Sequence, residues 1–190
     1  MRKHLAVSVG LLAALCRPVC ASAAGGPAYT ADPQQSRLEF TGVQAGAEFK
    51  GVFHKFSAVV DFAPEDLGAS RIDVQIDLNS ADTMDKDRDQ TIRGPDILDV
   101  SHFASAHYIT RSMTRTPSGF SAIGALTLRG VTKEVPIDFQ FSPGPTAAKL
   151  SGSAKLKRLE FGAGQGDWKT TEWIGDVVKV SFSLVLKPKT

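Results

Sequence analysis

Apolar and polar residues alternate over long stretches of this chain. In the segment 71–79 the even positions carry Ile, Val, Ile and Leu, whereas the odd positions are all polar or charged. The segment 178–187 repeats the alternation, with one apolar exception at Val185. Successive side chains of a β-strand point to opposite faces, so each segment has one apolar face and one polar face. Several such strands in one small chain predict a sheet that curls around an apolar interior.

Eight segments carry this pattern, and short turns join most of them. Short connections are typical of antiparallel neighbours, so we predict an all-β fold in which eight antiparallel strands form a barrel. The second segment changes parity at His54-Lys55, as a β-bulge does where a long strand bends around a barrel corner. The strands are expected at 36–43, 46–62, 71–79, 103–115, 120–128, 133–141, 150–157 and 178–187.

Two stretches interrupt the alternation. Between the third and fourth strands, a charged run at 82–93 is followed by Gly94-Pro95 and a short piece at 96–100. We expect a helical turn on each side of the Gly-Pro break, so that this short helical insertion closes or flanks a barrel mouth. The second stretch, 162–175, is rich in glycine and holds both tryptophans. It is predicted to be a loop.

The first 23 residues have the three-part pattern of a secretory signal peptide: a basic start, a short apolar run and small residues before a cleavage site. We expect cleavage after Ala23, a periplasmic protein and a single domain at 24–190; an uncleaved amphipathic start is the alternative. Cys16 and Cys20 lie in the part removed, so the mature chain would have no disulfide. Removal also takes away three basic residues and no acid, which lowers the net charge from +2 to −1. A near-neutral domain argues against nucleic-acid binding.

Several local patterns resemble functional sites without meeting their requirements. The acidic residues of 85–96 have calcium-loop spacing, but Gln90 stands where glycine is needed, so we predict a solvated charged turn. The histidines of the mature chain, at 54, 102 and 107, lack metal-ligand spacing and are expected at the surface or rim. The sequence does not exclude a catalytic serine triad, although it has no Gly-Xaa-Ser-Xaa-Gly elbow. The basic run Lys155, Lys157 and Arg158 is predicted to be a solvated face, with contact to an anionic membrane as the alternative.

The interior of such a barrel is either filled or hollow. Ala122, Gly124, Gly152 and Ala154 lie on apolar faces and leave volume that neighbours or a ligand must occupy. Patterning alone favours a core filled by phenylalanine rings, because aromatic stripes are usually core.

Several motifs, spread over nearly all of the region after residue 23, occur in an order that is specific in combination. They are Ser36–Phe40, Gly51-Val52-Phe53 with Phe56, Ser80 with Thr83 ahead of Arg88-Asp89, Asp96–Val100, Gly124–Lys133, Arg158–Gly164 and Gly166-Asp167-Trp168. With these motifs the chain resembles the YceI family of small exported lipocalin-like proteins. The resemblance implies an extended eight-stranded antiparallel barrel of lipocalin-like shape. It also implies that the bore holds a polyisoprenoid chain, isoprenoid quinones included, or a fatty acid derivative. The segment after Arg88-Asp89 departs from the commoner family pattern, so the mouth is expected to differ and the head group of the relatives' ligands is not carried over to this chain.

From this resemblance we expect ten ligand-binding residues and no catalytic or metal-binding residue. Arg88 is the expected partner of a phosphate or carbonyl head group. The expected bore residues are Phe40, Phe53, Phe56, Leu78, Phe139, Phe161 and Phe182, and the expected rim residues are Asp82, Arg88 and Trp168.

The expected function is that of a periplasmic carrier whose bound molecule is an isoprenoid lipid or quinone, with no other cofactor. Further expected partners are the membrane or a membrane b-type cytochrome, contacted transiently, and a second copy in a homodimer. Two alternatives remain. One is an enzyme that acts on a lipid-like substrate in the same cavity. The other is a filled-core stress or interaction module that binds another protein through Trp168 and Trp173.

Overall fold

Strands make up most of the structure, a computed structural model that describes residues 27–189. The expected signal peptide at 1–23 lies outside the described residues. One α-helix, α1 (Lys86–Arg93), and three short 3-10 helices, η1 (Leu78–Ser80), η2 (Arg158–Phe161) and η3 (Gly166–Lys169), connect the strands. The strands are β1 (Ala28–Ala31), β2 (Arg37–Gln44), β3 (Ala47–Phe53), β4 (Phe56–Asp61), β5 (Arg71–Asp77), β6 (Ala81–Asp82), β7 (Ser105–Thr116), β8 (Gly119–Leu128), β9 (Val131–Ser142), β10 (Ala148–Lys157) and β11 (Val177–Pro188).

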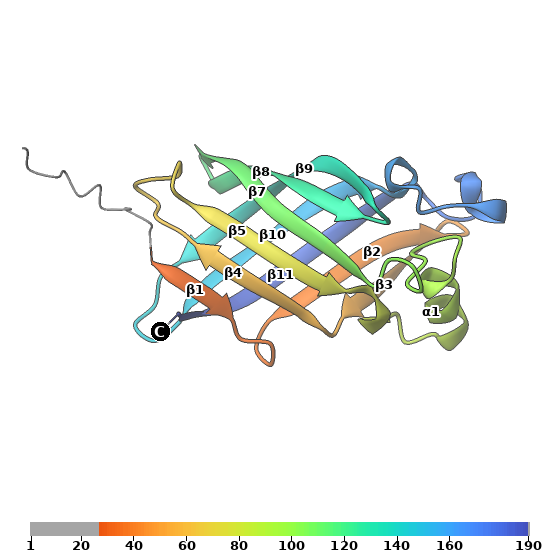
Figure 1. Cartoon of the computed structure of the whole chain (residues 1–190), viewed down its shortest axis with the longest axis horizontal. Coiled ribbons are helices and arrows are strands. Elements are labelled where there is room, and N and C mark those ends of the chain that lie inside the picture. Colours follow the sequence, from red (N-terminus) through yellow and green to blue (C-terminus); the bar gives the residue numbers. More distant parts are fainter. Residues whose placement is uncertain (1–26, 190) are drawn as a thin grey trace, which may run out of the picture.

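The strands form one closed antiparallel barrel (Figure 1). The sheet order is β1-β4-β5-β7-β8-β9-β10-β11, and β1 pairs with β11 to close the ring. β2 continues β1 along the same edge of β11, because β1 pairs near Leu186 and β2 pairs from Ser183 to Lys179. β3 with β4, and β5 with β6, are likewise successive pieces of one long strand. The prediction of an eight-stranded antiparallel barrel is therefore confirmed.

Interruptions within the long strands occur where the alternation fails. β3 ends at Phe53 and β4 begins at Phe56, so the parity change at His54-Lys55 marks a real break between them. The first strand starts earlier than predicted, since β1 at Ala28–Ala31 precedes it. A turn at 32–36 separates β1 from β2, and in it the Asp32 side chain accepts a hydrogen bond from the Gln34 N–H at 2.9 Å. Because this turn interrupts the alternation, the four residues of β1 do not extend the alternating pattern of β2.

The insertion before β7 contains one helix where two helical turns were expected. Asp85 caps α1 by accepting hydrogen bonds from the N–H groups of Asp87 and Arg88, each at 3.1 Å. After Gly94-Pro95 the chain makes tight turns, with the Asp99 N–H donating to the Gly94 carbonyl at 2.8 Å. The expected turn of helix at 96–100 is therefore wrong. The acidic run serves as a helix cap and first turn, which favours the helix N-terminus electrostatically.

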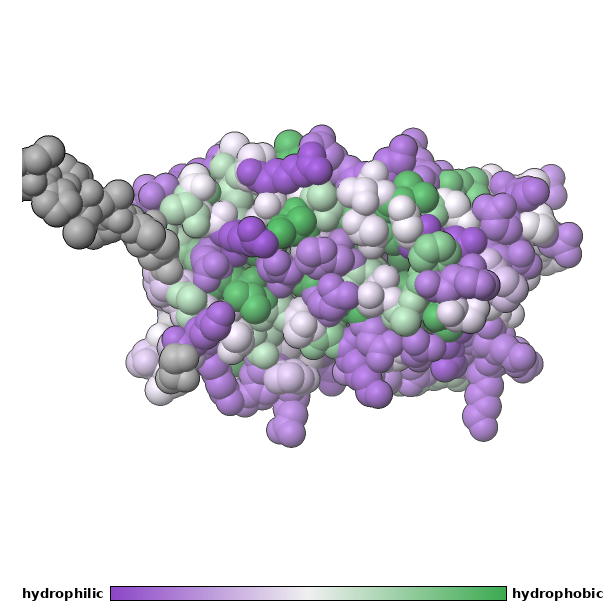
Figure 2. All heavy atoms as spheres, viewed as in Figure 1, coloured by the Kyte–Doolittle hydropathy of each residue, from purple (hydrophilic) through white to green (hydrophobic). Residues whose placement is uncertain are grey.

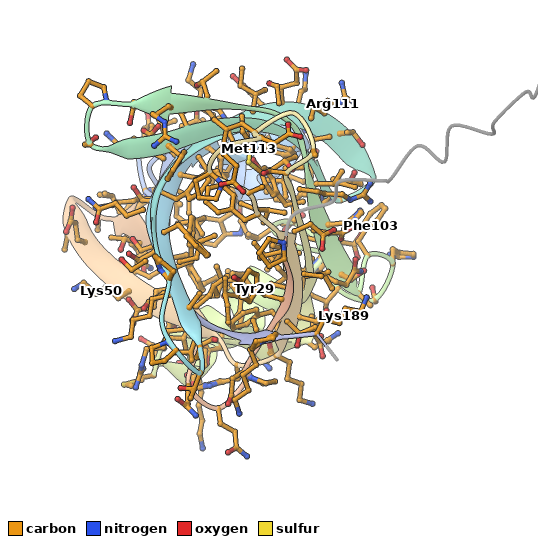
Figure 3. All side chains as sticks on the ribbon, turned by 90° about the vertical axis from the view of Figure 1, so that its left-hand side faces the viewer. Tyr29, Lys50, Phe103, Arg111, Met113 and Lys189 are labelled. Carbon is orange, nitrogen blue, oxygen red and sulfur yellow. The ribbon has the colours of Figure 1, made fainter. Side chains whose placement is uncertain are left out.

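Aromatic rings fill the half of the barrel that holds Ala28 at the start of β1 and Pro188 at the end of β11. Phe62 lies at the centre, with ring centroids 4.9 Å from Phe120, 5.6 Å from Phe139 and 4.7 Å from Phe141. Tyr29 extends this group by packing on Phe141 at 5.9 Å. We call these five residues the aromatic plug. Viewed end-on from this side, Tyr29 lies within the ring of strands (Figure 3).

Some of the small inward-facing residues accommodate rings from neighbouring strands. Gly152 pairs with Phe182 across β10 and β11, and a Cβ at Gly152 would come within 2.7 Å of that ring and 2.2 Å of the Asp138 carbonyl oxygen. Gly51 and Gly124 lie in the same way against Phe40 and Tyr108. The volume that these glycines leave is therefore occupied by the protein's own rings.

Replacing Gly152 with alanine is expected to lower the free energy of unfolding by about 1–3 kcal/mol, because backbone and ring must shift to admit a methyl group. Urea unfolding followed by circular dichroism measures the change. Ser151→Ala, at the exposed neighbouring position, serves as the control and should stay within about 0.5 kcal/mol of the parent. Equal stability of the two variants would contradict the packing described here.

The outer surface is mainly polar. One face shows charged and polar side chains with small apolar patches between them (Figure 2). In the end-on view, Lys50, Arg111 and Lys189 lie outside the ring of strands whereas Met113 lies inside (Figure 3). Within residues 27–189 the structure has no helix of the length and hydrophobicity needed to cross a bilayer.

Candidate functional site

An apolar cavity of about 210 Å³ occupies the other half of the barrel. An apolar cavity of about 150 Å³ stays dry and can admit a benzene-sized guest, so this one is large enough to receive part of a hydrocarbon chain. Most strands of the barrel contribute to its wall, as do the insertion around α1 and the segment after β10. Its lining includes Leu38, Phe40, Phe49, Phe53, Ile76, Leu78, Ile92, Ile97, Leu98, Ala106, Tyr108, Leu126, Leu128, Val135, Ile137, Ala154, Leu156, Arg158, Val178, Val180 and Phe182.

The interior is thus half filled and half hollow. The core predicted from patterning alone is present as the aromatic plug, and the cavity lies beyond it. This arrangement follows from register, because the pairing of β8 with β9 sets Phe120 opposite Phe139 near the plugged end.

Four of the seven expected bore residues line the cavity: Phe40, Phe53, Leu78 and Phe182. Phe40 and Phe53 pack together, with ring centroids 5.0 Å apart. The other three lie elsewhere. Phe139 belongs to the aromatic plug, Phe56 is half-buried against the core, and Phe161 is fully buried in η2.

The three expected rim residues do not line the cavity, and each has a protein partner. Asp82 in β6 bonds to His54 at 2.9 Å, and this hydrogen bond lowers the pKa of the Asp82 carboxyl. Arg88 forms an ion pair with Asp85 at 2.9 Å and stacks 4.8 Å above the Phe49 ring. Because Phe49 lines the cavity, the Arg88 guanidinium lies one side chain away from it. Trp168 is half-buried, and its carbonyl oxygen accepts a hydrogen bond from Arg158.

The insertion around α1 covers part of the cavity with Ile92, Ile97 and Leu98. Arg129, in the turn between β8 and β9, fixes this segment by donating to the carbonyl oxygens of Pro95 at 2.8 Å and Ile97 at 2.9 Å. These contacts tie the cover to the barrel wall. Ile92, Ile97 and Leu98 are three of the few apolar residues in this mostly polar insertion, and this was the sequence signal for their role.

Arg158 organises the segment that closes the cavity after β10. Arg158 is only 4% exposed, and its guanidinium donates five hydrogen bonds to backbone carbonyl oxygens. The acceptors, at 2.8–3.1 Å, are Ala163, Trp168, Thr170, Ile174 and Gly175. Burial lowers the pKa of Arg158, and nearby Asp176 opposes that effect. The prediction that Arg158 belongs to a solvated face is therefore wrong.

Strand parity is the signal that would have identified Arg158. On β10 the even positions Ala154 and Leu156 face inward, and Arg158 continues this series just past the strand end. Lys155 and Lys157 are odd and exposed, as predicted. A charged residue at an inward position must be paired or fully hydrogen-bonded, and Arg158 is the latter.

The polar groups at the cavity wall are already satisfied by the protein. Tyr108 donates its hydroxyl to the Val135 carbonyl at 3.3 Å, and burial raises its pKa above the ordinary value. The three histidines after residue 26 each bond to an aspartate on the surface: His54 to Asp82, His107 to Asp73 and His102 to Asp99. In the described part of the chain, no three acidic, histidine or cysteine side chains are grouped as a metal site. The cavity therefore offers burial of apolar surface as its main interaction.

The fold and the cavity define a small closed antiparallel barrel with an apolar interior. A model of the YceI-like domain matches residues 29–186, and the chain belongs to this family. A UPF0312 protein of Vibrio cholerae is 31% identical over 168 residues, which cover 85% of this chain and 87% of that protein.

Several solved structures share the fold. BcnA of Burkholderia cenocepacia is 28% identical, with a TM-score of 0.74, over 82% of this chain and 98% of that one. A polyisoprenoid binding domain from Saccharophagus degradans is 16% identical, with a TM-score of 0.63, over 86% of this chain and 99% of that one. At 16% identity, the similarity to the second structure shows a shared fold alone.

Proposed function

We propose that this protein binds the hydrocarbon tail of a polyisoprenoid lipid, isoprenoid quinones included, and carries it through the periplasm. The observation that carries the proposal is the apolar cavity within a closed barrel. Each buried CH₂ group contributes about 0.8 kcal/mol, so a prenyl chain gains affinity there without polar contacts. The similarity to a structure described as a polyisoprenoid binding domain supports this ligand class.

Location and exchange partners belong to the same proposal. The basic start, apolar run and small residues of 1–23 support export to the periplasm. A carrier needs a donor and an acceptor of its cargo, for which we propose transient contact with the membrane or a membrane b-type cytochrome. A homodimer is the proposed assembly, and analytical ultracentrifugation tests it.

The direct test is native mass spectrometry of the full chain purified gently from the periplasmic fraction, followed by organic extraction. The expected result is a barrel that carries one prenyl lipid. A protein that is empty, and that takes up neither ubiquinone nor geranylgeranyl phosphate when these are added, would refute the proposal. Recovery of the protein in the cytoplasm with residues 1–23 intact would refute the periplasmic role.

A further inference from the structure

The hydrogen-bonded ladder between β9 and β10 stops before either strand ends. Their register runs from Lys149 opposite Ser142 to Ala154 opposite Ile137. β9 continues for six more residues toward Val131, paired with β8, and β10 continues to Lys157, paired with β11. Both strands are therefore intact beyond the break, and each is paired only on its far edge.

Pro136 explains where the ladder ends. The two-residue turn Arg129-Gly130 has φ values of 50° and 72°, as in a type I′ hairpin, so Leu128 and Val131 form a hydrogen-bonded pair. Peptide groups alternate along a strand, so odd residues of β9 bond toward β8 and even residues toward β10. Pro136 is the first even residue past Ile137, and it has no N–H to donate to β10.

A hollow of about 280 Å³ lies on the outer surface over this break. Continued register would set Val135 opposite Leu156, and these two residues line both the hollow and the inner cavity. Their side chains therefore form the wall between the two spaces. Phe161 and Val177 add further apolar surface to the hollow.

Lysine side chains surround the hollow. Lys133, Lys155 and Lys157 belong to its lining. The acidic residues of the lining are neutralised, since Glu134 pairs with Arg111 at 3.4 Å and Glu160 with Lys157 at 3.7 Å. Within residues 27–189, Lys133 and Lys155 form no ion pair, and Lys179 lies opposite Lys155 in the ladder with β11. The rim of the hollow is therefore positively charged.

We propose that the break between β9 and β10 is a side port through which a prenyl chain reaches the cavity, and that Lys133 and Lys155 bind an anionic head group at its rim. This inference rests on the proposed function and narrows the ligand to a prenyl lipid with an acidic head, such as a prenyl phosphate. The prenyl chain of the ligand passes between Val135 and Leu156, and its phosphate stays outside the barrel, beside Lys133 and Lys155.

Restoring the missing hydrogen-bond donor tests the port. In Pro136→Val the ladder can extend across the break, so the association rate of geranylgeranyl phosphate is expected to fall about tenfold, because opening must now break ladder hydrogen bonds. Rapid mixing followed by desalting and native mass spectrometry measures the rate. Asp138→Val is the matched control, because Asp138 faces the same way on the strand and is already paired with Ser153. An unchanged rate in Pro136→Val, with hydrogen exchange showing that the ladder has extended, would overturn the port.

Cross-linking β9 to β10 gives a second test, which does not require the hydrogen-bonded ladder to extend. The pair Glu134→Cys and Lys157→Cys spans the break, and Gln140→Cys with Ser151→Cys spans the intact part of the same ladder. A disulfide, or a short bismaleimide where no disulfide forms, should slow uptake about tenfold in the first pair only. For the disulfide, reduction should restore the rate. Equal uptake by the cross-linked and free forms of the first pair would overturn the port.

The head-group site is tested by comparing geranylgeranyl phosphate with uncharged geranylgeraniol. Lys133→Gln with Lys155→Gln should weaken binding of the phosphate about tenfold at low salt and leave the alcohol unaffected. Lys50→Gln with Lys149→Gln, two exposed lysines away from the hollow, is the control. Equal loss for both probes, or no loss for either, would overturn the lysine assignment. Failure of the parent protein to bind either probe would instead refute the proposed function.

Discussion

Replacing Ala154 with phenylalanine is expected to raise the dissociation constant for geranylgeranyl phosphate by about 50-fold. Ala154 lies on β10 between Ile137 and Val180 and lines the cavity, so a ring at this position occupies space that the ligand needs. If the ring displaces about three methylene groups, each worth about 0.8 kcal/mol, the loss reaches that factor. Equilibrium titration monitored by native mass spectrometry measures it.

Ser151→Phe is the matched control for this experiment. Ser151 lies on the same strand but is exposed on the outer face, so its substitution should leave the affinity unchanged. Circular dichroism would establish that both variants are folded. Tight binding by Ala154→Phe would mean that the ligand does not occupy the cavity.

Replacing Arg158 with methionine is expected to lower the free energy of unfolding by about 3–5 kcal/mol. Methionine keeps much of the side-chain volume but donates no hydrogen bond, so the carbonyl groups of the segment from Ala163 to Gly175 lose their common partner. Chemical denaturation measures the stability. Limited proteolysis should show faster cleavage between Gly162 and Gly175.

Two further variants separate hydrogen bonding from charge at this position. Arg158→Lys keeps the charge with fewer donors and a different geometry, so an intermediate loss of stability is expected. Lys157→Met removes a charge from the exposed neighbour and should change stability by no more than about 0.5 kcal/mol. If Arg158→Met were as stable as Lys157→Met, the segment after β10 would not depend on the guanidinium.

Much of the barrel follows from local sequence pattern. Residues 71–77 alternate cleanly and form β5, and the parity change at His54-Lys55 coincides with the break between β3 and β4. β1 was missed because it is only four residues long and is separated from β2 by a turn. Turns and the apolar face together determine which strands pair, so the closed eight-stranded barrel could be predicted from the sequence.

The position of the cavity could not be predicted in this way. Phe139 and Phe182 each lie on the apolar face of an alternating strand, yet Phe139 belongs to the aromatic plug and Phe182 lines the cavity. Their difference depends on how far along the barrel each ring lies, and on which rings face it across the interior. Those distances follow from the registers of all the strands at once, which single segments do not reveal.

The aromatic plug also determines how the proposed carrier would exchange its ligand. The rings close one end of the barrel, so a ligand cannot pass through it from end to end, and the proposed port between β9 and β10 would serve both entry and exit. The donor and the acceptor of the ligand would then compete for one surface, and transfer would proceed as two successive encounters and not within a ternary complex.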